Sequence, residues 1–483
     1  MVSTTQFIID LSLLLASSVV AGEIANRLGQ AALVGQLLVG VLLGPTLIGP
    51  YIGLSSLSPE LGAIQTLATV FILFLAGLDI VPEQIYRMGA PNALMGVAVF
   101  TVPFAALTVA VHVIYPGTSL LTSLFLSLTL SITALPVMGI MLIEFGLTKS
   151  ALGRLVMNTA LINELVAVSV FAVLLQLRNG ASSGLTDIAI ASVSVALFIS
   201  VMLTIHMILR TLRAARWWEG LRIKFQQSWR TREGGFALLM VLVLGASLFS
   251  QFLGLTFVVG AFYAGLLVTR ESAGAAVHQS ISKVFDAVSW GFFIPLFFAF
   301  VGIEMNLRLV GSSFNILLLV VLLAVALLTK VMTGYGVARI LKWSEPNALA
   351  VGYLVSSRGA VELAMAVTLL GLHVFTTTQF TIVAAVGLVT TIVAPIGALR
   401  SWESDSATRE ELYQRVPRLR PGQERNRSFT PSFNYASGTE EFDFSGFRAD
   451  PQTPRPEEPP SEAPPRAPSK PPPLPKGSRE PPP

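Results

Sequence analysis

The chain has 483 residues, of which 53% are hydrophobic and only 12% are charged, and its formal net charge is +4. Soluble domains carry about 25% charged residues, so this composition predicts a membrane protein with many spans and gives no reason to expect nucleic-acid binding. The absence of cysteine excludes disulfides, thiol catalysis and cysteine metal sites.

Apolar runs recur throughout residues 1–400, and a transmembrane helix needs about 20 such residues. They predict an all-α polytopic membrane domain with about thirteen transmembrane helices. The first run lacks a basic n-region and a cleavage site, so we interpret it as a retained span and not as a signal peptide. The expected spans are residues 6–22, 31–49, 61–80, 91–115, 119–143, 151–176, 185–209, 234–253, 255–269, 284–302, 313–341, 347–371 and 377–399.

The basic residues of the expected loops indicate an orientation. With the N-terminus outside, the inside loops hold most of them, including a cluster from Arg210 to Arg232, and the outside loops hold only Arg178 and Arg308. Cytoplasmic loops are enriched in lysine and arginine. We therefore expect the N-terminus outside and the C-terminus in the cytoplasm, in a plasma or inner membrane.

The third expected span ends in Asp79, directly after the apolar run of residues 71–78. Asp10 lies near the N-terminal end of the first span. We interpret both as interfacial side chains. Contact of Asp79 with an ion pathway stays open as the alternative.

Ser131, Thr133 and Pro136 interrupt the expected span at residues 119–143. Proline removes a backbone donor and clashes with the preceding turn, so we predict that this helix is broken. The ends of two half-helices leave backbone groups unsatisfied, and the two hydroxyl groups add further oxygens. Secondary transporters build ion sites from broken helices near the membrane midplane.

Asn163 and Glu164 lie side by side in the next span, within an apolar stretch from Leu152 to Leu175. A charged side chain at the centre of a membrane helix costs about 2.5 to 3.5 kcal/mol on insertion scales. Such residues usually face a wet cavity and mark a route for ions or protons. We predict that this pair binds a cation or a proton; the alternative is a Glu164 paired structurally with a neighbouring helix.

A second interruption occurs at Ser356-Ser357-Arg358-Gly359, inside the span at residues 347–371. Transporter halves related as inverted repeats each contribute one broken helix, so we expect the two broken helices to cross. Arg358 lies one helical turn before Glu362, and a structural ion pair and a transport role are both open. Lys330 lies too deep in its span to reach the interface, and its expected partner is Glu164 or the carbonyl end of a half-helix.

Residues 401–483 differ in composition from the rest of the chain. From Pro451 onward, 15 of 33 residues are proline, which favours extended polyproline II and cannot form a packed core. We predict a disordered cytoplasmic tail. Residues 471–476 (PPPLPK) could bind an aromatic-lined groove of a polyproline-binding partner, and a solvating tail is the alternative.

Five stretches together carry a resemblance to a known family. They are residues 35–45 (GQLLVGVLLGP), 74–79 (FLAGLD), 131–137 (SITALPV) with the pair at 163–164, 260–265 (GAFYAG) with 297–302 (FFAFVG), and 356–363 (SSRGAVEL). In this order they resemble the monovalent cation:proton antiporters, specifically the branch that contains sodium/proton and potassium/proton exchangers. The resemblance covers about residues 6 to 399.

The resemblance implies a homodimeric exchanger with thirteen helices, in which a six-helix core moves against a dimerisation domain. It also implies that Asn163 and Glu164 occupy the positions of the family's ion-binding pair, where the family has Asp-Asp or Asn-Asp. The longer side chain of Glu164 departs from that pattern, which leaves the choice of cation open.

Competition between a proton and a sodium or potassium ion for Glu164 would produce exchange. Thr133, Ser131, Asn163 and carbonyl groups of the broken helix would supply further oxygens, while Pro136, Lys330, Arg358 and Glu362 shape the break and balance its charge. The alternatives are proton-coupled export of another solute and a membrane scaffold that acts through its tail. We expect neither a cofactor nor an enzymatic activity, because the sequence contains no nucleophile and base pair, metal cluster or phosphate loop.

Overall fold

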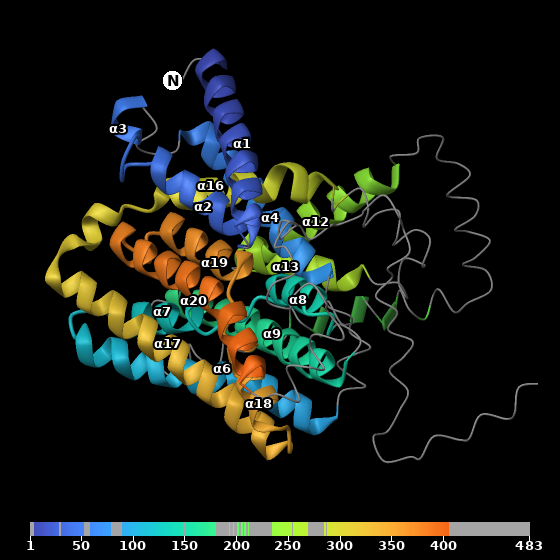
Figure 1. The fold of residues 1–483 in the computed structure, drawn as a ribbon. Coiled ribbons are helices and arrows are strands. Elements are labelled where there is room, and N and C mark those ends of the chain that lie inside the picture. The colour runs from blue at the N-terminus through green and yellow to red at the C-terminus, as the bar shows by residue number, and fades with distance from the viewer. Residues whose placement is uncertain are drawn as a thin grey trace, which may run out of the picture. The chain divides into compact units, whose positions relative to one another are not determined.

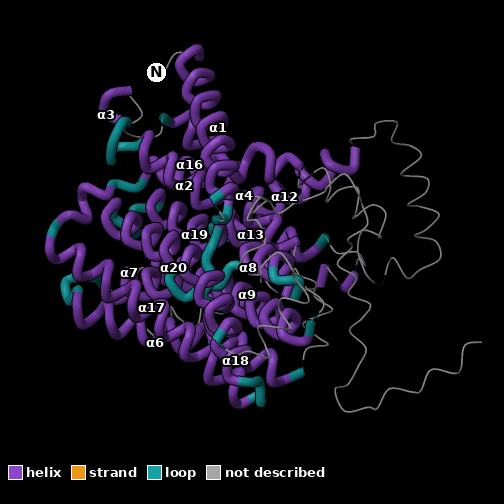
Figure 2. Tube along the Cα trace, in the orientation of Figure 1, coloured by secondary structure: helices purple, strands orange, loops and turns teal. Residues whose placement is uncertain are grey.

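The computed structural model describes residues 4–28, 30–52, 58–78, 89–147, 150–179, 234–253, 255–268, 285 and 287–404, with scattered positions between 193 and 211. Every regular element in these residues is a helix (Figures 1 and 2). Asp79, most of the expected span at 185–209, most of the basic cluster from Arg210 to Arg232 and the tail from residue 405 lie outside the described residues.

Seven segments of the described chain are long and apolar enough to cross a membrane. They are α1 (Thr4–Arg27), α4 (Pro59–Leu78), α6 (Ala90–Ile114), α9 (Ala151–Asn179), α17 (Ser313–Ile340), α18 (Glu345–Val355) together with α19 (Ala360–Gly371), and α20 (Thr377–Glu403).

Shorter helices complete the described fold. They are α2 (Ala32–Leu43), α3 (Gly49–Ile52), α7 (Leu120–Thr129), α8 (Leu135–Glu144), α12 (Gly234–Phe252), α13 (Phe257–Leu267), the π-helix η1 (Ser289–Phe293), α16 (Ile294–Glu304) and the 3-10 helix η2 (Leu307–Gly311). Twelve of the thirteen expected spans therefore coincide with described helices, and the seventh lies mostly outside the described residues.

Contacts between helices divide the fold into two sets. The panel set comprises α1, α2, α4, α12, α13 and α16, in which α2 packs on α1 and α16, and α13 packs on α4 and α12. The crossing set comprises α6 to α9 and α17 to α20, in which α17 packs on α6 and α18, and α9 packs on α6. Figure 1 shows α1, α2 and α16 in its upper part and α6, α17 and α18 in its lower part.

Pairs of glycines bring the panel helices into close contact. A Cβ atom on Gly40 of α2 would lie 2.1 Å from a backbone oxygen of α16, and one on Gly302 of α16 would lie 2.3 Å from a backbone oxygen of α2. Gly77 of α4 and Gly265 of α13 face each other in the same way, at 1.9 and 2.2 Å from backbone oxygens. Small residues at such contacts allow membrane helices to pack closely, and each of these two contacts joins a helix of the first half of the chain to a helix of the second half.

The last helix extends beyond the expected membrane boundary at residue 400. Ser401 and Trp402 are buried, and the Trp402 indole Nε1 donates a hydrogen bond to Asn347 Oδ1 at 3.0 Å. The Trp402 ring also meets Phe145 edge to face, with centroids 5.2 Å apart. The packed part of the chain therefore includes the first residues of the segment that composition assigned to the tail.

Candidate functional site

Two interrupted helices meet inside the crossing set, as the sequence predicts. The first interruption separates α7 from α8, and the second separates α18 from α19. The Ala134 backbone N–H donates to the Ser357 carbonyl at 3.3 Å, and the Thr133 hydroxyl donates to the Val355 carbonyl at 2.8 Å. The two breaks are therefore directly hydrogen-bonded to each other.

Local sequence explains where the first helix stops and restarts. The Ser131 hydroxyl donates to the Ser127 carbonyl at 2.6 Å, one turn back along α7, and such bonds weaken regular helix geometry. Pro136 is the second residue of α8, where a missing backbone N–H costs little because the first turn leaves its donors unpaired. The proline predicted to break the helix thus begins its second half.

Close backbone approach at the crossing requires a small residue at position 359. A Cβ atom on Gly359 would lie 2.7 Å from a methyl group of Val137 and 2.8 Å from the Cβ of Ala134. The backbone of the second break therefore packs directly against the start of α8.

Asn163 of α9 holds the first break in place. Its Oδ1 accepts a hydrogen bond from the Thr133 backbone N–H at 2.7 Å, and its Nδ2 donates to the Ser131 carbonyl at 3.3 Å. All three residues are fully buried. The amide side chain therefore supplies both a donor and an acceptor to backbone groups that the interrupted helix leaves unsatisfied.

Lys330 of α17 contacts the same break. Its Nζ donates to the Ile132 carbonyl at 2.6 Å and to the Thr133 hydroxyl oxygen at 2.5 Å. Of the two partners that the sequence left open, the structure shows the backbone of the broken helix. Thr133 is thereby the shared point of contact for α9, α17 and α18.

Arg358 ties the second break to the end of α7. Its guanidinium donates to the carbonyl groups of Thr129 and Leu130, and its Nη1 also contacts Glu362 Oε1 at 3.2 Å. The C-terminal carbonyls of a helix carry partial negative charge, so they share the positive charge of Arg358 with the carboxylate. The Thr391 hydroxyl donates to the Arg358 carbonyl at 2.9 Å.

Glu164 is fully buried on α9, immediately after Asn163. The crossing set contains four buried charged side chains among its described residues, namely Glu164, Lys330, Arg358 and Glu362. Two are acidic and two are basic, so the buried charges balance when all four are ionised. Ions at membrane depth are costly unless they are compensated.

The structure thus brings Thr133, Asn163 and Lys330 into direct contact, and it joins Ser131 to this group through its carbonyl. The sequence did not identify the carbonyl groups of Thr129 and Leu130, or the Thr391 hydroxyl, as partners of Arg358. An arginine deep in a span signals that acceptors are present, but their positions depend on the crossing of helices more than two hundred residues apart.

Comparison with known proteins identifies the family. The family model described as sodium/hydrogen exchanger, transmembrane, matches residues 13–399. The chain belongs to this family. It is accordingly a multi-pass integral membrane protein of a transporter family.

The relatives that are named as antiporters align with this chain over different shares of their length. The sodium/proton antiporter of Enterococcus hirae is 26% identical over 74% of this chain and 88% of its own length, and the antiporter GerN of Bacillus cereus, named for sodium/proton and potassium exchange, is 24% identical over 81% and 95%. Cation/proton antiporter 18 of Arabidopsis thaliana is 30% identical over 63% of this chain. The chain spans 37% of the length of that plant relative.

A solved exchanger structure shares the fold. The sodium proton antiporter MjNhaP1 of Methanocaldococcus jannaschii matches with a TM-score of 0.58 over 84% of this chain and 98% of its own, at 15% sequence identity. The predicted architecture of membrane helices with two interrupted, crossing members is therefore confirmed.

Proposed function

We propose that the protein is a secondary antiporter that exchanges a monovalent cation, sodium or potassium, for protons at Glu164. The observation that carries the proposal is a fully buried carboxylate next to Asn163, whose amide is hydrogen-bonded to the broken helix. Membership of the exchanger family and the activities for which its relatives in Enterococcus hirae and Bacillus cereus are named agree with this proposal.

The mechanism follows from competition for one carboxylate. A cation that loses its water must regain oxygen ligands, and Glu164 with the Thr133 hydroxyl and the carbonyl groups of the break would supply them. A proton neutralises the same carboxylate without other ligands. If the crossing set moves only when Glu164 is neutralised, each movement carries either a cation or a proton, and exchange results.

Asn163 and Ser131 have a positioning role in this mechanism. The Asn163 amide bonds to backbone groups on both sides of Ile132, and the Ser131 hydroxyl is engaged within α7. We infer that Asn163 maintains the shape of the break, so that the carbonyl groups stay directed toward the site. Lys330 and Arg358 compensate the carbonyl ends that the break exposes.

Exchange in proteoliposomes tests the proposal. A pH gradient should dissipate on addition of sodium or potassium with the unaltered protein. We expect Glu164→Gln to abolish this flux while the protein remains folded, and Glu164→Asp, which keeps the charge, to retain part of it. Near-normal coupled flux in Glu164→Gln would remove Glu164 from the mechanism.

We propose further that the protein is a homodimer, as its resemblance to the antiporters implies. Its N-terminus would lie outside and its C-terminus in the cytoplasm, as the distribution of arginine and lysine favours. Labelling of single cysteines introduced at residues 4 and 404 with an impermeant reagent tests the orientation, because the chain has no cysteine of its own. The mass of the purified protein in detergent, measured by light scattering, tests the dimer.

A further inference from the structure

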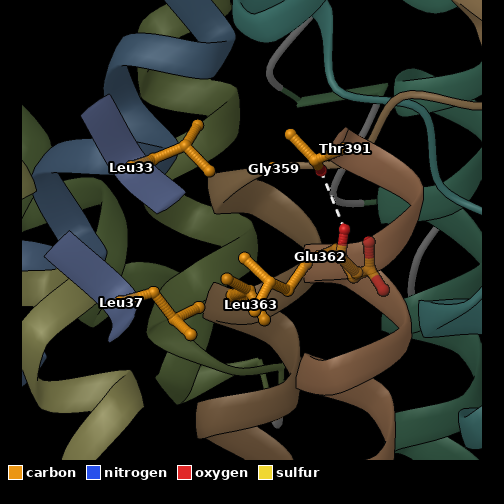
Figure 3. Close-up of a pocket in the computed structure, with 8 residues that line it drawn as sticks. Leu33, Leu37, Gly359, Glu362, Leu363 and Thr391 are labelled. Atoms are coloured by element: carbon orange, nitrogen blue, oxygen red, sulfur yellow. Dashed lines mark hydrogen bonds between the residues drawn. The ribbon is translucent and has the colours of Figure 1, made fainter. Parts of the chain in front are cut away.

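A small cavity lies between the two sets of helices, beside Glu362. Leu33 and Leu37 of α2 line it from the panel set, and Glu362 of α19 with Gly387 and Thr391 of α20 line it from the crossing set. In Figure 3, Leu33 and Leu37 point from α2 toward α19, and the Glu362 carboxylate lies between α19 and α20. The cavity has room for about one water molecule.

One oxygen of Glu362 has no hydrogen-bond donor among the described residues. The side chain is 1% exposed, its Oε1 is engaged by Arg358, and Oε2 is buried without a partner. An ionised carboxylate accepts several hydrogen bonds, and leaving one of its oxygens unsatisfied in a buried position is costly. This oxygen therefore requires a water molecule, a cation or a proton.

The charges around Glu362 come from two basic residues. Arg358 contacts Glu362 directly but shares its positive charge with the carbonyl groups of Thr129 and Leu130. The positive charge of Lys330, on α17, also attracts the Glu362 carboxylate. The residues of α2 and α20 that line the cavity are uncharged. Burial of Glu362 penalises its ionised form, whereas both basic residues favour it.

We propose that Glu362 is a second proton-binding carboxyl group of this exchanger, which takes up a proton on Oε2 at the boundary between α2 and the crossing set. An O–H bond forms at Oε2, and the hydronium ion that gives up the proton leaves as water. The role in exchange rests on the proposed antiport, but the protonation itself does not.

The chemistry of the cavity favours a proton over an alkali cation. A dehydrated sodium or potassium ion needs several oxygens to replace its hydration shell. The side chains that line the cavity offer only the Glu362 carboxylate and the Thr391 hydroxyl, and the rest of the side-chain lining is leucine. A proton needs a single oxygen, which Oε2 provides.

The position of the cavity gives protonation a consequence. Leu33 and Leu37 of the other helix set line the cavity beside Glu362, and a buried carboxylate is more costly there than a neutral carboxyl group. Proton uptake at Glu362 should therefore ease displacement of α19 and α20 along α2. In this way Glu362 would act on the rate and pH dependence of exchange without contributing to cation binding.

Infrared difference spectroscopy tests the protonation directly, because a carboxylic acid shows a C=O stretching band that a carboxylate lacks. The measurement compares Glu164→Gln with Glu164→Gln/Glu362→Gln in lipid, titrated with pH in the absence of sodium and potassium. We expect a band in the first protein that is lost in the second. Identical spectra would show that Glu362 stays ionised, and would overturn the proposal.

Gly387→Ala provides a variant that leaves the Arg358 contact of Glu362 intact. Its methyl group would lie 3.5 and 3.6 Å from the two Glu362 oxygens, an ordinary van der Waals distance, and it would exclude water from the cavity. The matched control is Gly336→Ala, whose methyl group would meet no atom within 4 Å. Both changes replace glycine by alanine within a helix, which alone tends to stabilise it.

We expect Gly387→Ala to move the midpoint of the Glu362 band and the pH of half-maximal exchange by about one pH unit to more alkaline values, because loss of water favours the neutral carboxyl group. Cation affinity should stay within about twofold, and Gly336→Ala should change neither. An unchanged exchange profile with a shifted band would overturn the role of Glu362 in exchange. Exchange retained by Glu164→Gln would instead remove the proposed antiport site and leave the Glu362 band in place.

Discussion

Asn163 connects the chemistry of the site to its stability, because its amide is hydrogen-bonded to the backbone on both sides of Ile132. Asn163→Ala leaves the buried Thr133 N–H and Ser131 carbonyl unpaired. We expect the free energy of unfolding to fall by about 1–3 kcal/mol for each group left unsatisfied, and exchange to fall with it. Denaturation in detergent micelles measures the first effect, and flux in proteoliposomes the second.

Asn315→Ala is the matched control for this change. Asn315 also donates a side-chain hydrogen bond to a backbone carbonyl, that of Leu309 at 2.7 Å, but this bond is exposed, at the start of α17. Water can replace an exposed hydrogen bond, so this variant should lose less than about 1 kcal/mol. Equal stability of the two variants would contradict the assigned role of Asn163.

The positive charge of Lys330 lies at the break, where it favours the ionised form of nearby carboxyl groups. Lys330→Gln removes the charge, so a buried carboxyl group there should hold its proton to higher pH. We expect the pH profile of exchange to move to more alkaline values, and Lys330→Arg to move it less. An acid shift, or no shift in protein shown to be folded, would leave Lys330 with a purely structural role.

Buried polar residues and the local pair of Arg358 with Glu362 could be predicted from the sequence, but the atoms that partner them across the fold could not. An apolar stretch that contains Asn163, Glu164, Lys330 or Arg358 identifies each of them as a buried polar residue, because the energetic cost of insertion is large. The bond from Lys330 to Thr133 joins residues 197 apart in the chain. Such a contact follows from the packing of α17 on the crossing, which no local pattern encodes.

At the scale of elements, the contact between α2 and α16 depends on glycine. Gly302→Ala would place a Cβ 2.3 Å from a backbone oxygen of α2, so the two helices must separate. Overpacking of this kind typically costs about 1–3 kcal/mol. We expect a lower melting temperature for Gly302→Ala, measured in detergent.

Gly245→Ala of α12 is the control, because its Cβ would meet no atom within 4 Å. Its melting temperature should stay the same or rise slightly, since alanine favours the helix. If Gly302→Ala melted at the same temperature as Gly245→Ala, the close approach of α2 and α16 would not contribute to stability.

Helix interruptions were predictable because their causes are local. Hydroxyl groups and a proline at residues 131–136, and a glycine at 359, mark both breaks in the sequence. The end of α20 was less well predicted, because composition changes at residue 400 while packing continues to Trp402. In the sequence, a tryptophan followed by charged residues is typical of the start of an exposed tail. Only the structure shows that Trp402 is hydrogen-bonded to Asn347.

For the whole molecule, the position of a truncation decides its effect. A chain that ends after Ser404 keeps the Trp402 contacts with Asn347 and Phe145, and we expect it to retain exchange. A chain that ends at Arg400 loses this buried side chain, and truncation of a buried tryptophan costs about 3–5 kcal/mol. Comparing yield, melting temperature and flux of the two chains tests this expectation; an inactive but stable 404-residue protein would show that the tail takes part in transport.

The hydrogen bonds that join the two interruptions also limit how the molecule can work. The contacts of Thr133, Ala134 and Arg358 with the opposite break would all have to open for one half-helix to move alone. Among the described residues, no hydrogen bond joins Leu33 or Leu37 of α2 to α19 or α20, so displacement of the crossing set along α2 opens fewer bonds at this place. When the helices of the crossing set move along α2, the lipids beside them must adapt to a changed hydrophobic thickness, at a modest cost per ångström of mismatch. We therefore expect the rate of turnover to depend on bilayer thickness, independently of the ions on either side.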